Sequence, residues 1–70
     1  MTKFFLTKNY QIIDLENMNS FWIEIVRFDG QSESVYVFAK EDEMEWRIAE
    51  FTKEEDAKDY LKMIYDELTE

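Results

Sequence analysis

The chain has 70 residues, contains neither cysteine nor histidine, and carries a formal net charge of −9. This length predicts a single domain over residues 1–70, and the two missing residue types exclude disulfides, thiolate metal sites and the commonest general base. Because lysine and arginine are few and unclustered, direct binding to a nucleic-acid backbone is also disfavoured.

The sequence has no apolar run close to the roughly 20 residues that a membrane-spanning helix requires. The first residues include Lys3 but no apolar segment followed by small side chains, so we expect no secretory signal. We therefore expect a cytoplasmic protein that does not bind membranes.

Two short β-prone segments begin the chain, at residues 3–7 and 10–14, and the Lys-Asn pair at 8–9 is typical of a tight turn. These segments predict a hairpin. Leu15 and Met18 lie in the polar bend that follows, and we expect both side chains to close one end of the core.

A longer strand is predicted at residues 20–28, which are apolar in both alternating registers, as is normal for a strand that is central in a sheet or covered by another element. Asp29-Gly30 is the strongest hairpin signal in the chain, because both residues tolerate a positive φ. The polar residues 31–33 lengthen this loop, and the next strand is expected at 34–40.

The charged segment 41–43 is expected to be an exposed turn, and a last strand is predicted at 45–51. Strict alternation along this strand places Trp46 and Ile48 on one face and Ala49 on the other.

The segment from Thr52 to Glu55 has the form of a capping box, in which the Thr52 hydroxyl accepts a hydrogen bond from the Glu55 backbone N–H. A helix is therefore predicted over residues 53–68. Its apolar stripe has spacings of four, three and four residues: Ala57, Leu61, Ile64 and Leu68. The predicted fold is α+β, a five-stranded antiparallel β-meander with this C-terminal helix packed on one sheet face.

The residue inventory predicts a protein that is not an enzyme. The densest carboxylates lie in the exposed segment 41–45, where they remain solvated, and neither this segment nor Asp29-Gly30 has the spacing of a calcium loop. A single glycine also excludes a glycine-rich phosphate loop. We predict no catalytic residues, no cofactor and no metal ligands.

Negative charge is concentrated in the last 30 residues, which contain twelve acidic and four basic side chains, a net charge of −8. If these carboxylates share one surface, that surface would bind a basic groove of another protein. The plain alternative is a solvated face that only keeps the protein soluble. The predicted partner-binding residues are Glu41, Asp42, Glu43, Glu45, Glu50, Glu54, Glu55, Asp56 and Asp59.

Three aromatic residues, Trp22, Tyr36 and Phe38, would share one sheet face if the strands that carry them pair. In a chain this small most aromatic residues belong to the core. If the shared face lies opposite the helix, however, it is a candidate surface for a homodimer.

Three features follow one another over most of the chain: the segment Ile-Ile-Asp-Leu-Glu-Asn-Met at 12–18, a meander, and a helix with the pattern Phe-Thr-x-Glu-Glu-x-Ala-x-x-Tyr-Leu at 51–61. With this order of features, the chain resembles small uncharacterised acidic proteins of Gram-positive bacteria and their phages. This resemblance implies no known catalysis. Some small acidic phage proteins inhibit host-defence nucleases, including by imitating DNA, and the sequence is compatible with that class.

The leading hypothesis is a non-enzymatic module that docks its acidic surface on a basic protein partner, as a phage or mobile-element inhibitor of a nucleic-acid-handling complex. The alternative is a homodimeric structural or regulatory accessory whose interface is the aromatic sheet face. An enzyme would instead require a buried carboxylate in a pocket.

Overall fold

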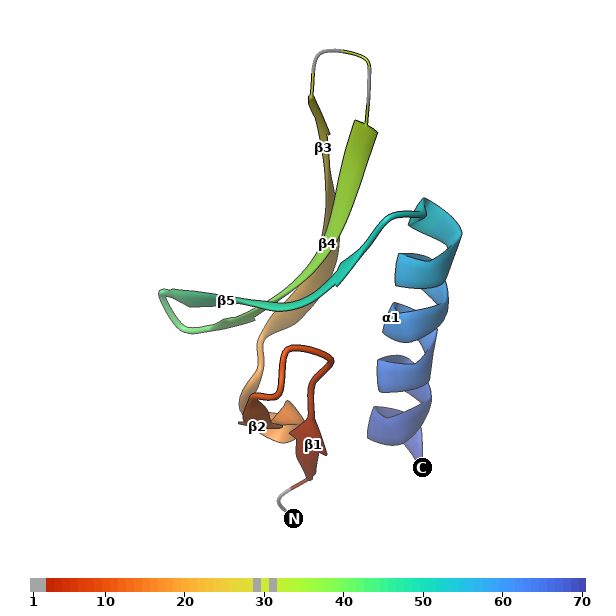
Figure 1. The fold of residues 1–70 in the computed structure, drawn as a ribbon. Helices are drawn as coiled ribbons and strands as arrows, with labels where there is room; N and C mark the ends of the chain where they lie inside the picture. The colour runs from red at the N-terminus through yellow and green to blue at the C-terminus, as the bar shows by residue number, and fades with distance from the viewer. Residues whose placement is uncertain (1–2, 29, 31) are drawn as a thin grey trace.

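The computed structural model describes residues 3–28, 30 and 32–70, and these residues confirm the α+β class. Within them the strands form two antiparallel sheets, one of two strands and one of three, and a single α-helix ends the chain (Figure 1). The elements are β1 (Phe4–Leu6), β2 (Ile12–Asp14), a 3-10 turn (Leu15–Asn17), β3 (Ser20–Phe28), β4 (Ser32–Glu41), β5 (Met44–Phe51) and α1 (Glu54–Thr69).

The five strands do not form the single meander that the sequence predicts, because β1 and β2 pair only with each other. Each of these strands has only three residues, and the 3-10 turn redirects the chain before β3 begins. The loop of the first hairpin still reaches the larger sheet, where the Asn9 N–H donates to the Ile48 carbonyl at 3.2 Å and the Asn9 side-chain amide donates to the Arg47 carbonyl at 3.2 Å. The first hairpin thus occupies part of the outer edge of β5 without continuing its ladder.

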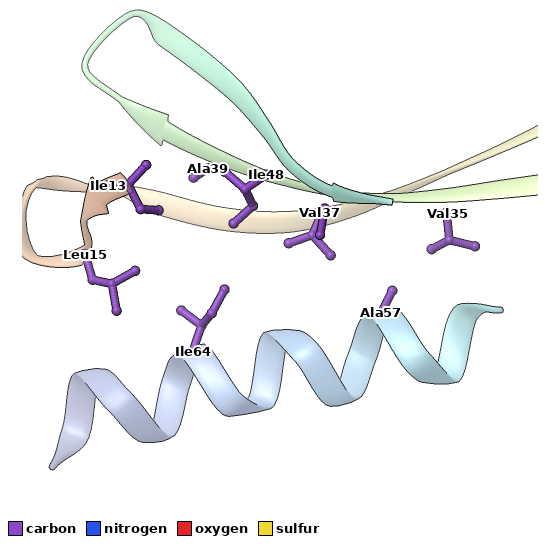
Figure 2. Packing of buried hydrophobic residues seen from close by; sticks show 9 residues of the cluster. Ile13, Leu15, Val35, Val37, Ala39, Ile48, Ala57 and Ile64 are labelled. Atoms are coloured by element: carbon purple, nitrogen blue, oxygen red, sulfur yellow. The ribbon is translucent and has the colours of Figure 1, made fainter. Parts of the chain in front are cut away.

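The core lies between α1 and one face of the three-stranded sheet. Val35, Val37 and Ala39 of β4 are completely buried on this face, and Ala57 and Ile64 of α1 point toward them (Figure 2). Such alternation along a central strand is expected when one face packs against a helix.

One end of this core is closed by the first hairpin and the turn after it. Ile13 and Leu15 are buried there, and Met18 packs beside them, as the sequence predicts for Leu15 and Met18. Figure 2 shows Ile13 and Leu15 at the end of the core that also contains Ala39.

A β-bulge in β5 changes the predicted faces of that strand. Val37 pairs with Ala49 but the next residue of β4, Phe38, pairs with Arg47, so Ile48 is an extra residue. Ile48 and Ala49 are consequently both buried, and Trp46 lies on the helix side, opposite Ala39. The strict alternation predicted for this strand is wrong because a bulge shifts the register by one residue.

The second hairpin is longer than the sequence predicts, because Ser32 pairs with Phe28 and both Ser32 and Glu33 belong to β4. Gly30 has the positive φ, +71°, that the turn prediction requires. Asp29 and Gln31 lie outside the described residues.

The capping box predicted at Thr52 is wrong, because α1 begins one residue later than it requires. Lys53 is the N-cap residue, with extended φ and ψ of −125° and 137°, and its side chain makes no capping hydrogen bond. The third helical residue is therefore Asp56 rather than Glu55, so the Thr52 hydroxyl is not at the cap position. The described residues include no helix long and apolar enough to cross a membrane.

Candidate functional site

The nine carboxylates predicted to bind a partner form two separate groups in the structure. We call Glu41, Asp42, Glu43 and Glu45, at the β4–β5 turn, the acidic hairpin tip. We call Glu50, Glu54, Glu55, Asp56 and Asp59, around the beginning of α1, the helix-start acids. Glu45 and Glu50, the members of the two groups that are nearest in the chain, lie five positions apart in β5, roughly 15 Å along the strand. Figure 1 shows the β4–β5 turn projecting away from α1.

The acidic hairpin tip is a tight turn that is held in place from outside. Glu41 and Met44 are the last paired residues, so Asp42 and Glu43 form a two-residue connection in which Asp42 has a φ of +53°. The Asp42 backbone N–H donates to the Asn19 side-chain oxygen at 2.5 Å. This hydrogen bond ties the turn to the segment before β3 and reduces the freedom that the tip would lose on binding.

The carboxylates of the acidic hairpin tip have no internal partners among the described residues. Asp42, Glu43 and Glu45 are exposed, Glu41 is half-buried, and none of the four accepts a hydrogen bond or forms an ion pair there. Lys40 lies opposite Glu45 in the sheet register without forming an ion pair. The tip therefore presents four carboxylates that form no ion pair with the described residues.

Three of the five helix-start acids, in contrast, have structural roles. Glu54, Glu55 and Asp56 lie in the first turn of α1, where carboxylates interact favourably with the positive end of the helix dipole. Glu54 also forms an ion pair of 3.0 Å with Lys58. Positive charge lies close by, because the Lys8 ammonium group donates to the Glu50 carbonyl at 2.5 Å.

A cavity of about 290 Å³ opens beside the acidic hairpin tip, and we call it the tip cavity. It lies between the tip, the second strand and the 3-10 turn, and is lined by Gln11, Ile12, Ile13, Asp14, Asn17, Met18, Glu41 and Trp46. Of the predicted site residues only Glu41 lines it. Sequence reasoning missed the cavity because its walls come from segments about 30 residues apart, and no local pattern links those segments.

One wall of the tip cavity has an oriented carboxylate. The Oδ1 atom of Asp14 accepts hydrogen bonds from the backbone N–H groups of Lys3, at 3.3 Å, and Glu16, at 3.1 Å. The Glu16 hydrogen bond caps the 3-10 turn, so the orientation of Asp14 follows from the local backbone. The second Asp14 oxygen accepts no hydrogen bond from the described residues.

The three predicted dimer-face residues come together on the sheet face away from α1. Trp22 pairs with Phe38 in the register and their rings stack, with centroids 5.5 Å apart and an interplanar angle of 12°. The Tyr36 ring meets the Phe38 ring edge-on at 6.3 Å, and the Arg47 guanidinium lies 4.6 Å from the centre of the Tyr36 ring. All three aromatic side chains are half-buried, so this face has a continuous aromatic strip in partial contact with solvent.

Fully buried polar side chains and metal-binding clusters are scarce among the described residues. Thr7 is the one polar residue among them that is buried, and its hydroxyl accepts a hydrogen bond from the Gln11 backbone N–H at 2.9 Å. No group of three or more acidic side chains is arranged there to hold a metal ion.

Comparisons with protein-family models, curated proteins and solved structures found no match to this chain. The resemblance to small acidic bacterial and phage proteins therefore stays a prediction.

Proposed function

We propose that this chain is a protein-binding module that docks its acidic hairpin tip on a basic surface of a protein partner. The observation that carries this proposal is a projecting two-residue turn that, with the strand ends beside it, has four carboxylates without an ion pair to any described side chain. Unlike Glu54, Glu55 and Asp56, these carboxylates lie at no helix terminus and form no ion pair in the described structure.

Electrostatics favours such a use of the tip. Four like charges on one protrusion attract a basic surface over distances comparable with the Debye length, which accelerates encounter and makes association sensitive to salt. The hydrogen bond from Asp42 to Asn19 keeps the turn in one conformation, so docking costs little conformational freedom.

A basic groove that binds nucleic-acid phosphates is the partner surface that this tip fits best, because carboxylates present the same charge to the lysine and arginine side chains of the groove. More specifically, we propose that the chain is an inhibitor, such as a phage or mobile-element protein. It would occupy the nucleic-acid site of a host-defence complex. Single-stranded or duplex DNA would then compete with this chain for the partner.

The test compares two variants with the same change of charge. The tip variant carries Glu41→Gln, Asp42→Asn, Glu43→Gln and Glu45→Gln. The control variant also carries three Glu→Gln changes and one Asp→Asn change, placed in α1 and at the residue that follows it: Glu55→Gln, Asp56→Asn, Glu67→Gln and Glu70→Gln. Stopped-flow association with a nona-arginine peptide at 20 mM and 300 mM NaCl is the measurement.

We expect the tip variant to associate about tenfold more slowly than the wild type at low salt, with a smaller loss in the control and convergence of all three proteins at high salt. Equal association rates for the two variants would show that net charge alone governs binding, and would overturn the docking role of the tip. Capture of a nucleic-acid-binding protein from the native host by the wild type, but not by the tip variant, would identify the partner.

The aromatic strip supports a second candidate function, a homodimeric accessory protein whose interface is the open sheet face. The supporting observation is the partly exposed stack of Trp22 on Phe38 on the face that α1 leaves uncovered. Sedimentation equilibrium at micromolar concentrations should then show a dimer that Trp22→Ser converts to a monomer. A wild-type protein that sediments as a monomer would exclude this candidate.

A further inference from the structure

From the tip cavity we infer a binding site for a cationic side chain, best an arginine, that projects from the partner surface. The inference rests on the proposed docking of the acidic hairpin tip, which would bring a basic surface to the mouth of this cavity. Beyond the docking itself, one side chain of the partner would enter this cavity and contact two carboxylates and one indole ring there.

The polar part of the cavity is built to accept hydrogen bonds from a cation. Asp14 is held by two backbone N–H groups through Oδ1, which leaves Oδ2 without a donor among the described residues. Glu41 lines the same cavity and has no donor there either. Two carboxylates around one space suit a guanidinium group, because its N–H groups form charge-assisted hydrogen bonds in a fixed plane.

The apolar part of the cavity suits the rest of an arginine side chain. Trp46, Met18 and Ile12 line it, and indole is the aromatic ring that attracts cations most strongly. A guanidinium group also stacks on aromatic rings, while its three-carbon stem is stabilised by contact with apolar side chains. None of the lysine and arginine residues that the structure describes lines the cavity. The Lys3 ammonium group donates instead to the Glu67 and Glu70 carbonyls at the end of α1.

Size favours an organic cation over a metal ion. A volume of about 290 Å³ corresponds to that of roughly ten water molecules. It therefore holds a whole side chain, and it is at the lower limit of what drug-sized ligands occupy. The described residues offer no cluster of three acidic side chains for a metal.

Nuclear magnetic resonance can test the site directly, because Trp46 lines the cavity and Trp22 lies on the opposite sheet face as an internal reference. The probes are the amides of Nα-acetyl-arginine, Nα-acetyl-lysine and Nα-acetyl-citrulline, the last of which has the shape of arginine without its charge. We expect the arginine probe to shift the indole N–H signal of Trp46 and not that of Trp22. The lysine probe should bind several-fold more weakly, and citrulline at least about tenfold more weakly.

Two variants with the same change of charge distinguish binding in the tip cavity from attraction by the net charge of the protein. Glu41→Gln should weaken binding of the arginine probe about fivefold, whereas Glu67→Gln, on the last turns of α1, should leave it nearly unchanged. Equal weakening by both changes would assign the binding to net charge and overturn the inference.

The remaining outcomes separate this inference from the proposed function. If nona-arginine association depends on the tip but Trp46 does not respond to any probe, or responds equally to arginine and citrulline, the cavity site is wrong and the docking role stands. If Trp46 responds selectively to arginine but the tip variant associates with nona-arginine as fast as the control variant, the cavity site stands and the docking role is wrong.

Discussion

At the scale of single residues, Tyr60 connects the first hairpin, the large sheet and the helix. Its ring packs against Phe5 at 6.0 Å and Phe51 at 5.4 Å, and its hydroxyl accepts a hydrogen bond from the Lys8 backbone N–H at 2.9 Å. Burial raises the pKa of Tyr60 above its usual value of 10.0, and the hydrogen bond from Lys8 lowers it by a smaller amount. Tyr60 therefore contributes packing contacts, a hydrogen bond and a pH-dependent part of the stability.

Replacing Tyr60 with Phe keeps the ring and removes the hydroxyl, so we expect a loss of up to about 1 kcal/mol of unfolding free energy at pH 7. Because the pKa of Tyr60 is higher in the folded state, the wild type binds more protons when folded and loses stability as the pH rises above about 10. The Tyr60→Phe variant lacks this contribution. Urea denaturation of both proteins at pH 9 and pH 11 should therefore show a smaller difference at pH 11, and a constant difference would contradict the assignment.

At the scale of elements, the beginning of α1 lacks the side-chain cap that stabilises many helices. Lys53 occupies the N-cap position without a capping hydrogen bond, and its positive charge lies at the positive end of the helix dipole. The preceding Thr52 carries a good capping side chain one position too early. The acidic residues of the first turn compensate through charge, which explains why the helix begins there without a side-chain cap.

Lys53→Ser should therefore stabilise the protein, because serine supplies the missing hydrogen bond and removes the unfavourable charge. We expect a gain of about 1 kcal/mol, which raises Tm by roughly 4–8 °C in a domain of this size. Lys62→Ser, an exposed position in the interior of α1, removes the same charge without creating a cap and is the matched control. Thermal unfolding followed by circular dichroism is the measurement, and equal Tm changes for the two variants would refute the capping argument.

At the scale of the whole molecule, net charge opposes the compact state. The chain carries a charge of −9, and the ion pairs in the described part of the structure are Arg27 with Glu33 and Lys58 with Glu54. Both pairs are largely exposed and contribute little. Most carboxylates therefore repel one another across a small domain whose core consists chiefly of residues from one sheet face, one helix stripe and the 3-10 turn.

Sodium chloride should consequently stabilise the protein by screening this repulsion. Between 20 mM and 300 mM NaCl we expect Tm to rise by about 4 °C, which corresponds to roughly 1 kcal/mol in a domain of this size. The tip variant with four neutralised carboxylates should show a smaller rise. A Tm that does not change with salt would mean that the carboxylates are too far apart to interact.

Much of the fold could be predicted because its signals are local. Ala57 and Ile64, two residues of the predicted helix stripe, are buried against the sheet, and the pairing of Trp22 with Phe38 follows from strands whose positions the alternating pattern already indicates. Local sequence signals also predict the α+β class, the turn at Gly30 and the closing of the core by Leu15.

The candidate site was predicted less well, because it depends on how distant segments meet. The bulge at Ile48 moves Trp46 to the helix side of β5, and only the first hairpin and the 3-10 turn then place Asp14 and Met18 beside it. The separation of the nine carboxylates is likewise a consequence of an extended strand between them.

The amino-acid sequence alone determined the secondary-structure elements, the faces that most of them bury and the excess of negative charge, because residue type and spacing act over a few neighbouring positions. The tertiary structure decided the division into two sheets, the isolation of the acidic hairpin tip and the composition of the tip cavity. Those features depend on a one-residue shift in strand register and on contacts between residues far apart in the chain, whose energies no local pattern encodes.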